Sequence, residues 1–226
     1  MSEPFETIAI TTHKVVKDQP SPPLIYTFEG DTVDEQPAYL TDRWMVADKD
    51  YLEVKSIAGL TGDRGLELSL SSTARYFASF DDIDESEDVS IRARVRSTST
   101  DGIRWMFVFR GQADSGINLQ HTGVSFRLQN LTAVDPVAES TVASHSHTLD
   151  TSVYYSIRAR LIGTTFQAKI WDADTEPEPG WQIDESDLSI PTAAGWVGFG
   201  ARSGSGVEIL DYITIGLGED DAPELP

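Results

Sequence analysis

Alternation of apolar and polar residues recurs along this chain, and it limits the fold more than any other feature. The apolar members of the two clearest runs are Val89, Ile91, Ala93, Val95, Ile157, Ala159 and Leu161. Because successive side chains of a β-strand point to opposite faces, each run predicts a strand with one face in a core. No segment of 11 residues keeps a helical period. The sequence therefore predicts an all-β protein.

Further strands are predicted wherever short alternating or apolar runs stand between turn signals. They cover residues 24–28, 51–57, 65–71, 75–80, 103–110, 123–129, 165–171, 196–202 and 207–215. Glycine-containing turns separate them, for example at 101–102 and 203–206. About a dozen short strands at this spacing favour two packed antiparallel sheets.

The chain divides into three parts by composition. Residues 1–23 contain one alternating stretch, Ile8–Val16, and then a proline-rich connector, which together predict an extended N-terminal arm. Residues 24–217 form the predicted sandwich, since domains of this class commonly contain roughly 200–250 residues. Residues 218–226 are acidic and contain proline, so we expect a loosely held C-terminal tail.

Composition excludes several classes of function. The net charge is −20 and only five residues are lysine, so the overall field disfavours binding to nucleic acid. The absence of cysteine excludes disulfides, thiolate metal sites and cysteine catalysis. The first residues lack the basic and apolar regions of a signal peptide, and no apolar stretch approaches the ~20 residues of a membrane span. We expect cytoplasmic synthesis, with a final location in a virion or another extracellular assembly.

Several strand segments resemble a known family. They are Tyr26–Asp31 followed by Trp44, Asp88–Ser97, Tyr154–Arg160, Ala168–Trp171 with Pro179–Trp181, Gly195–Gly200, and Leu210–Ile215. These segments are similar to strands of laminin-G-like and concanavalin A-like jelly rolls found in bacterial and phage proteins. The resemblance covers about residues 24–217 and implies a two-sheet antiparallel jelly-roll sandwich, in which 89–96 and 155–161 are neighbouring strands. It specifies function poorly, since members include lectins, glucanases, adhesins and virion components.

An acidic segment imitates the catalytic motif of glucanases with this fold, Glu-x-Asp-x-x-Glu. Its members here are Asp82, Asp84 and Glu87, and a second acidic group lies at Asp184, Glu185 and Asp187. The first position is Asp rather than Glu, and so many acids repel one another on a strand but not in a solvated loop. We therefore expect loops, and no hydrolase activity that depends on Asp82, Asp84 or Glu87.

Two pairs of residues are candidate metal ligands. The resemblance implies a structural calcium ion that ties the first strand to the last, where Glu29 and Asp211 stand at corresponding ends. The alternative is that Asp211 caps a turn and Glu29 faces water. His145 and His147 would point the same way on a strand and form half of a zinc or nickel site, or simply part of a polar, solvent-facing strand.

Basic and aromatic residues supply the candidate ligand-binding positions. These are Arg92, Arg94, Arg96, Arg158 and Arg160, which would make one sheet face basic, together with Trp171 and Trp181. Arginines recognise carboxylates of an acidic saccharide or a partner, and exposed aromatic rings stack on sugars. The alternatives are cross-strand pairing of the arginines with acids such as Glu67 or Glu208, and tryptophans that cover the sheet edge.

Three classes of function follow from these patterns. The first is a non-enzymatic structural or interaction protein of a virion, such as a capsid decoration or a tail or fibre component, which assembles as an oligomer with other subunits through residues 1–23 and binds host glycan. The second is a carbohydrate-binding lectin module with cell-surface polysaccharide as its ligand. The third is a glycoside hydrolase, which the weak acidic motif places last.

Overall fold

A computed structural model describes residues 24–46, 49–70, 75–81, 83, 85–100, 103–133, 135, 138–202, 206–218 and 221–224. The predicted arm, residues 1–23, lies outside this range. Within these residues every regular element is a β-strand, as predicted. The same residues contain no helix of the length and apolar character needed to cross a membrane.

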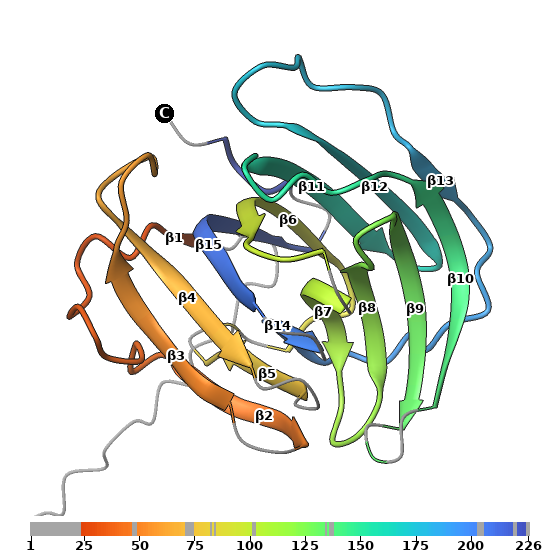
Figure 1. Ribbon diagram of the computed structural model, residues 1–226. Coiled ribbons are helices and arrows are strands. Elements are labelled where there is room, and N and C mark those ends of the chain that lie inside the picture. The colour runs from red at the N-terminus through yellow and green to blue at the C-terminus, as the bar shows by residue number, and fades with distance from the viewer. Residues whose placement is uncertain are drawn as a thin grey trace, which may run out of the picture.

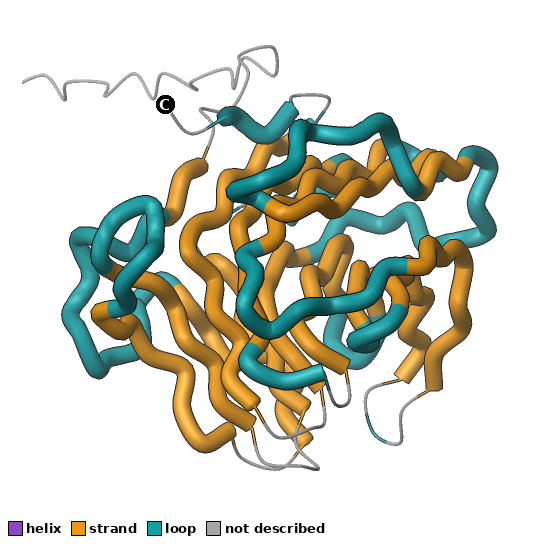
Figure 2. The backbone as a smooth tube through the Cα atoms, turned by 45° about the horizontal axis from the view of Figure 1, so that its top comes forward, coloured by secondary structure: helices purple, strands orange, loops and turns teal. Residues whose placement is uncertain are grey.

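The strands form two antiparallel sheets that pack face to face (Figure 1). Sheet A has the order β13 (Ile183–Glu185), β12 (Thr165–Asp172), β11 (Tyr155–Ile162), β6 (Val89–Ser97), β15 (Gly206–Leu217), β4 (Arg64–Leu70) and β3 (Lys49–Ser56), and β1 (Leu24–Tyr26) also pairs with β15. Sheet B has the order β10 (Ala138–Ser146), β9 (Ser125–Ala133), β8 (Gly116–His121), β7 (Ile103–Gly111), β14 (Trp196–Arg202), β5 (Arg75–Phe80) and β2 (Leu40–Val46). The connections run around and across this body of strands (Figure 2).

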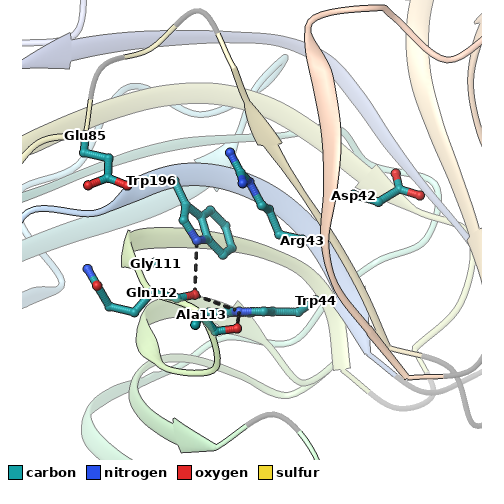
Figure 3. A pocket seen from close by; sticks show the side chains of 8 residues that line it. All are labelled: Asp42, Arg43, Trp44, Glu85, Gly111, Gln112, Ala113 and Trp196. Carbon is teal, nitrogen blue, oxygen red and sulfur yellow. Dashed lines mark hydrogen bonds between the residues drawn. The ribbon is translucent and has the colours of Figure 1, made fainter.

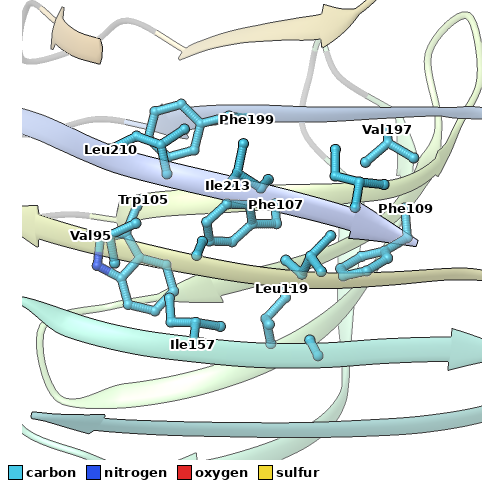
Figure 4. Close-up of a cluster of buried hydrophobic side chains, with 14 of the residues drawn as sticks. Val95, Trp105, Phe107, Phe109, Leu119, Ile157, Val197, Phe199, Leu210 and Ile213 are labelled. Atoms are coloured by element: carbon cyan, nitrogen blue, oxygen red, sulfur yellow. The ribbon is translucent and has the colours of Figure 1, made fainter. Parts of the chain in front are cut away.

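Strand registers place the alternating residues as the sequence predicts. In the pairing of β11 with β6, Ile157 lies opposite Ala93 and Arg158 lies opposite Arg92. The apolar members of both strands point toward sheet B, where they meet residues such as Phe107 and Leu119 (Figure 4). All seven residues predicted for this core are buried: Val89, Ile91, Ala93, Val95, Ile157, Ala159 and Leu161. That part of the prediction is confirmed.

Sheet B curls over its own outer face. Trp44 on β2 lies four strands from β8, yet its Cη2 is 3.1 Å from where a Cβ on Gly116 would stand. Arg202 on β14 pairs with Glu139 on β10 at 2.7 Å, although three strands separate these two. A second apolar cluster fills the concavity: Trp44, Phe77, Met106, Val108, Leu131 and Trp196. Curling therefore turns the outer face of sheet B into a partly enclosed surface.

A buried arginine fixes the end of strand β7. Arg110 has a φ of 52° and its side chain is fully buried. It donates to the carbonyl oxygens of Glu87, Pro191 and Gly163, the last two at 2.9 and 2.7 Å. These bonds join three connections to sheet B. The left-handed backbone at this residue also starts the turn that carries Gln112 and Ala113.

Several predicted elements are corrected by the structure. The sequence predicts one strand over 123–129, whereas Thr122–Val124 form a turn between β8 and β9. Strands β2, β8 and β10 were not predicted: the apolar residues of β2 do not alternate with its polar ones, β8 has only Ile117 and Leu119 as apolar side chains, and β10 is largely polar. Residues 183–185, expected within a connection, form the edge strand β13 because Ile183 packs in the core and lies opposite Ala168.

Candidate functional site

A pocket of about 340 Å³ lies at one end of the concave face of sheet B. Strand β2 contributes Asp42, Arg43 and Trp44, the end of β7 and the turn after it contribute Gly111, Gln112 and Ala113, β14 contributes Trp196, and Glu85 precedes β6 (Figure 3). Four segments that are distant in the sequence therefore build one depression. A concave pocket with a few convergent polar groups is the usual form of a small-molecule site.

Two tryptophans form the apolar wall of this pocket. Their ring centroids are 4.6 Å apart and the planes cross at 66°. Trp44 Nε1 donates to the carbonyl oxygens of Gln112 and Ala113 at 3.0 and 3.1 Å, and Trp196 Nε1 donates to that of Gln112 at 3.2 Å. These bonds attach both rings to the β7–β8 turn, as the dashed lines in Figure 3 show. The wall is thus preformed.

Glycine is required beneath one of these rings. A Cβ on Gly111 would lie 2.2 Å from Cε2 of Trp196, closer than any real contact. The missing side chain therefore leaves the space that Trp196 occupies. Since Trp44 and Trp196 are only 3% and 7% exposed, they offer a ligand a narrow apolar strip rather than two open ring faces.

Charged groups stand around the mouth of the pocket. A register shift between Asp42 and Trp44 inserts Arg43 as an extra residue in β2. Its Nε donates to Ser79 Oγ at 2.7 Å, and its guanidinium lies 3.3 Å from Asp81. Asp42 accepts a hydrogen bond from the Tyr76 hydroxyl, and burial together with this carboxylate raises the pKa of Tyr76. The pocket thus combines carboxylate acceptors and a guanidinium donor with an apolar wall.

The sequence did not predict this pocket. Residues 196–202 are predicted only as a strand and Trp44 appears only in the resemblance, and the sequence assigns no role to Asp42, Arg43 or Glu85. The two tryptophans are 152 residues apart. Their contact depends on the curl of sheet B and on the bulge at Arg43. Neither feature has a signal in the apolar–polar alternation.

The predicted arginines lie on the outer face of sheet A, as the alternation requires. Arg94 binds Asp211 at 2.7 Å and Asp174 at 2.9 Å, and its guanidinium stacks over the Tyr154 ring at 4.4 Å. Arg96 stacks over the same ring at 4.7 Å. Arg92, Arg158 and Arg160 bind carboxylates of the β12–β13 connection and the tail, at Glu178, Asp221 and Glu224. The partners therefore come chiefly from connections rather than from neighbouring strands.

The two predicted tryptophans differ in exposure. Trp171 on β12 is 5% exposed, so it covers the sheet and presents little surface to a ligand. Trp181 is half-buried and lies over three cations, with Lys169 Nζ at 4.3 Å, Arg160 at 5.2 Å and Arg158 at 5.6 Å from its ring centre. The structure brings Trp181 to the arginines, whereas the pocket in sheet B lies elsewhere. Ligand binding at Trp171 and Trp181 stays a prediction.

The two predicted calcium ligands bind the same turn. Asp211 accepts hydrogen bonds from the backbone N–H and hydroxyl of Thr61 at 3.0 and 2.8 Å. Glu29 accepts from the N–H groups of Asp63 and Arg64, both at 3.1 Å. The described residues include no group of three or more potential metal ligands. Both carboxylates thus hold the β3–β4 turn, and the calcium site stays a prediction.

The remaining sequence motifs are placed as follows. Glu87 lies in the connection before β6, as predicted, whereas Asp82 and Asp84 lie outside the described residues. His145 is on β10, but His147 follows the strand and its Nδ1 lies 3.0 Å from Nε2 of the buried His121. The sequence did not predict this contact, because His121 ends β8 whereas His147 lies in the connection after β10, 26 residues later.

No family model matches this sequence, and no curated protein matches it either. Solved structures do match. A carbohydrate-binding module, CBM66 from Bacillus subtilis, is 13% identical, with a TM-score of 0.55 over 75% of this chain and 94% of that one. The Ca²⁺-bound exoplasmic/lumenal domain of VIP36 is 10% identical, with a TM-score of 0.56 over 90% and 96% of the two chains.

Lectin II from Ulex europaeus is 6% identical and has a TM-score of 0.56 over 88% of this chain and 100% of its own. Such low identities carry no information about ligands, but the agreement extends over most of each chain. The strand order, the two antiparallel sheets and the single core between them agree with the same architecture. The chain therefore has the concanavalin A-like jelly-roll fold of lectins and carbohydrate-binding modules.

Proposed function

We propose that this chain is a non-catalytic carbohydrate-binding protein and that the pocket between Trp44 and Glu85 is its binding site. The observation that carries the proposal is the pocket itself, because carboxylates and a guanidinium surround a tryptophan wall there. The polar groups match sugar hydroxyls, which both donate and accept hydrogen bonds, and the narrow apolar strip of Trp44 and Trp196 suits a C–H edge of a sugar rather than its whole face. The fold supports this proposal as an analogy, since a fold by itself does not specify function.

The rigidity of the wall favours binding. Three indole hydrogen bonds and the glycine at 111 hold both rings in place before any ligand arrives. A preformed site loses less conformational entropy when a ligand binds. The pocket is also small, so it fits one or two sugar units at the end of a chain rather than a long polysaccharide.

A glycan array followed by calorimetry tests this function. We expect the full chain to bind one class of glycan, and Glu85→Gln or Asp42→Asn to weaken that binding about tenfold or more, because each loses a charged hydrogen-bond acceptor at the pocket. Glu87→Gln is the matched control, since this exposed carboxylate belongs to the same connection but does not line the pocket. Its affinity should equal that of the unmodified chain.

Two results would contradict the proposal. Equal affinities for the Glu85 and Glu87 variants would place the sugar elsewhere. The appearance of new reducing ends in the bound glycan, lost in Glu85→Gln, would mean that the pocket hydrolyses its ligand. A loss of turnover in Glu87→Gln would instead restore the glucanase-like motif.

We also propose the finer role inferred from the sequence, display of this domain on a virion or similar extracellular assembly through residues 1–23. An edge strand such as β10 supports it, because an extended arm from a neighbouring subunit pairs with such an edge. Deleting residues 2–20 should leave the melting temperature nearly unchanged while abolishing incorporation into particles or oligomers. Normal assembly of the truncated chain, or its unfolding, would exclude an arm.

A further inference from the structure

We propose that the outer face of sheet A binds acidic peptide segments, and that residues 221–224 of the chain occupy this surface as an internal ligand. The surface, here called the arginine surface, consists of Arg92, Arg158, Arg160, Lys169 and Trp181. It is separate from the pocket of sheet B. Residues 221–224 already lie on this surface, and their contacts show which kind of ligand it binds.

The strand register forces like charges together on this surface. Arg92 on β6 lies directly opposite Arg158 on β11, and Arg160 follows two residues later. Like charges directly opposite each other are destabilising on a sheet, so this arrangement needs nearby anions. Glu178 supplies one, with carboxylate oxygens 3.3 Å from Arg92, 3.2 Å from Arg158 and 2.6 Å from Lys169. One carboxylate thus serves three cations.

The acidic tail supplies the other anions. Asp221 lies 3.1 Å from Arg158 and 3.6 Å from Arg160, and Glu224 lies 2.7 Å from Arg92. Between them, the carbonyl oxygen of Pro223 accepts a hydrogen bond of 2.8 Å from the buried Thr214 hydroxyl. The composition of residues 218–226 predicts a loosely held tail, whereas Asp221, Pro223 and Glu224 contact sheet A through side chains and backbone.

The backbone contact favours a peptide as the ligand of this surface. The Thr214 hydroxyl donates to a backbone carbonyl, an acceptor that every residue of a peptide carries at a fixed spacing from its side chains. Ala222, the residue between Asp221 and Pro223, is 5% exposed, so the surface also accommodates a small apolar side chain. The segment that fits this surface therefore has two carboxylates three positions apart, like Asp221 and Glu224, and a small residue such as Ala222 between them.

The tail neutralises part of the positive charge on the outer face of sheet A. Arg92, Arg94, Arg158, Arg160 and Lys169 face five carboxylates, of which Asp221 and Glu224 belong to the tail. Without these two, the cations are in excess at this place, although the whole chain carries a net charge of −20. A vacated surface therefore attracts an anion locally.

The tail is held by contacts that a competitor can replace. The Asp221 and Glu224 side chains are 51% and 74% exposed, and ion pairs with such exposure contribute little because water and salt screen them. By contrast, the three arginines are only 14–34% exposed and remain positioned by their strands. An acidic segment of another chain, including a second copy of this tail, therefore exchanges with residues 221–224.

Fluorescence anisotropy with the full chain tests this proposal. The probe is a labelled peptide with the sequence of residues 218–226. Weak binding is expected to the unmodified chain, and about tenfold tighter binding to Asp221→Asn/Glu224→Gln, in which the internal carboxylates no longer compete. Raising salt from about 50 mM to about 500 mM should remove the difference, since exposed charges are then screened.

Two controls separate this surface from unspecific charge effects. Adding Arg92→Gln and Arg158→Gln to the double variant should abolish binding, whereas adding Arg127→Gln, on β9 of sheet B, should not. A peptide with Asn and Gln in place of its acids should not bind. Melting curves of each variant confirm that the chain is folded.

The proposal is wrong if Asp221→Asn/Glu224→Gln does not increase the affinity for the peptide, or if binding survives the loss of Arg92 and Arg158. A polyuronate such as polygalacturonate is the competing probe. If it binds the double variant through these arginines while the peptide does not, the surface recognises an acidic saccharide instead.

Discussion

Replacing Ala93 by Asp is expected to unfold the domain. Ala93 on β6 is fully buried, with Ile157 on one neighbouring strand and Ile213 on the other. A carboxylate at this position has no partner and cannot reach water. An unpaired buried charge costs about 3–5 kcal/mol, which is a large part of the about 5–15 kcal/mol that stabilises a typical domain.

Far-UV circular dichroism and soluble yield measure this effect. We expect Ala93→Asp to be insoluble, or to melt far below the unmodified chain. Val124→Asp is the matched control, because Val124 is 64% exposed in the β8–β9 turn, and its melting temperature should not change. Normal melting of Ala93→Asp would show that β6 has the opposite register.

Mild acid is expected to destabilise the protein through the histidine pair. The backbone N–H of Gly123 donates to His121 Nδ1 at 2.9 Å, so this nitrogen carries no proton. His121 Nε2 then donates to His147 Nδ1 at 3.0 Å, and both rings are neutral. Burial, together with the nearby His147, lowers the pKa of His121 to about 3.

The sign of the effect follows from the pKa of His121 in the two states. The unfolded chain takes up a proton near the ordinary histidine pKa of about 6.5, whereas the folded chain does so only near pH 3. Between these values the unfolded state binds more protons, so stability decreases as the pH falls. The expected slope is about 1.4 kcal/mol per pH unit for one histidine. Burial also lowers the pKa of His147, which adds to the effect.

Urea unfolding between pH 7.5 and pH 4 measures this slope. Carboxylates titrate in the lower part of the range with effects of both signs. Protonation reduces the self-repulsion of this acidic chain, whereas Asp150, Asp172 and Glu178, whose pKa values are lowered in the folded chain, lose stabilising interactions. The pH dependence of the unfolding free energy is therefore compared with that of His121→Gln. This variant lacks the proton uptake of His121, so its slope should be smaller by about 1.4 kcal/mol per pH unit. His145→Gln serves as a control: the His145 charge contributes to lowering the pKa of His147, so its slope should change by much less than that of His121→Gln. Equal slopes for all three proteins would refute the histidine mechanism.

Much of the fold was predictable because it depends on local pattern. The alternation in residues 89–96 and 155–161 predicts both the strands and the faces that they bury, and the structure confirms both. The pattern failed where strands are polar on both faces, as in β10, or where a turn interrupts an apolar run, as at Thr122–Val124. In those places the neighbouring strands decide the conformation.

The candidate sites were predictable only in part. The arginines of β6 and β11 were assigned to one face, and they lie there. Their partners Glu178, Asp221 and Glu224 were not predicted, because they come from connections whose path the alternation does not describe. The function proposed from residues 1–23 concerns a segment outside the described residues and stays a prediction.

The sequence by itself determined the all-β class, the faces of the core strands and the basic outer surface of sheet A, since a strand places each side chain by the parity of its position. Only the tertiary structure decided the pocket. Trp44 and Trp196 meet because sheet B curls and a bulge inserts Arg43, and the tail reaches Arg92 because β15 ends beside β6. Curvature and long-range contacts depend on the packing of all strands together, and no local pattern encodes them.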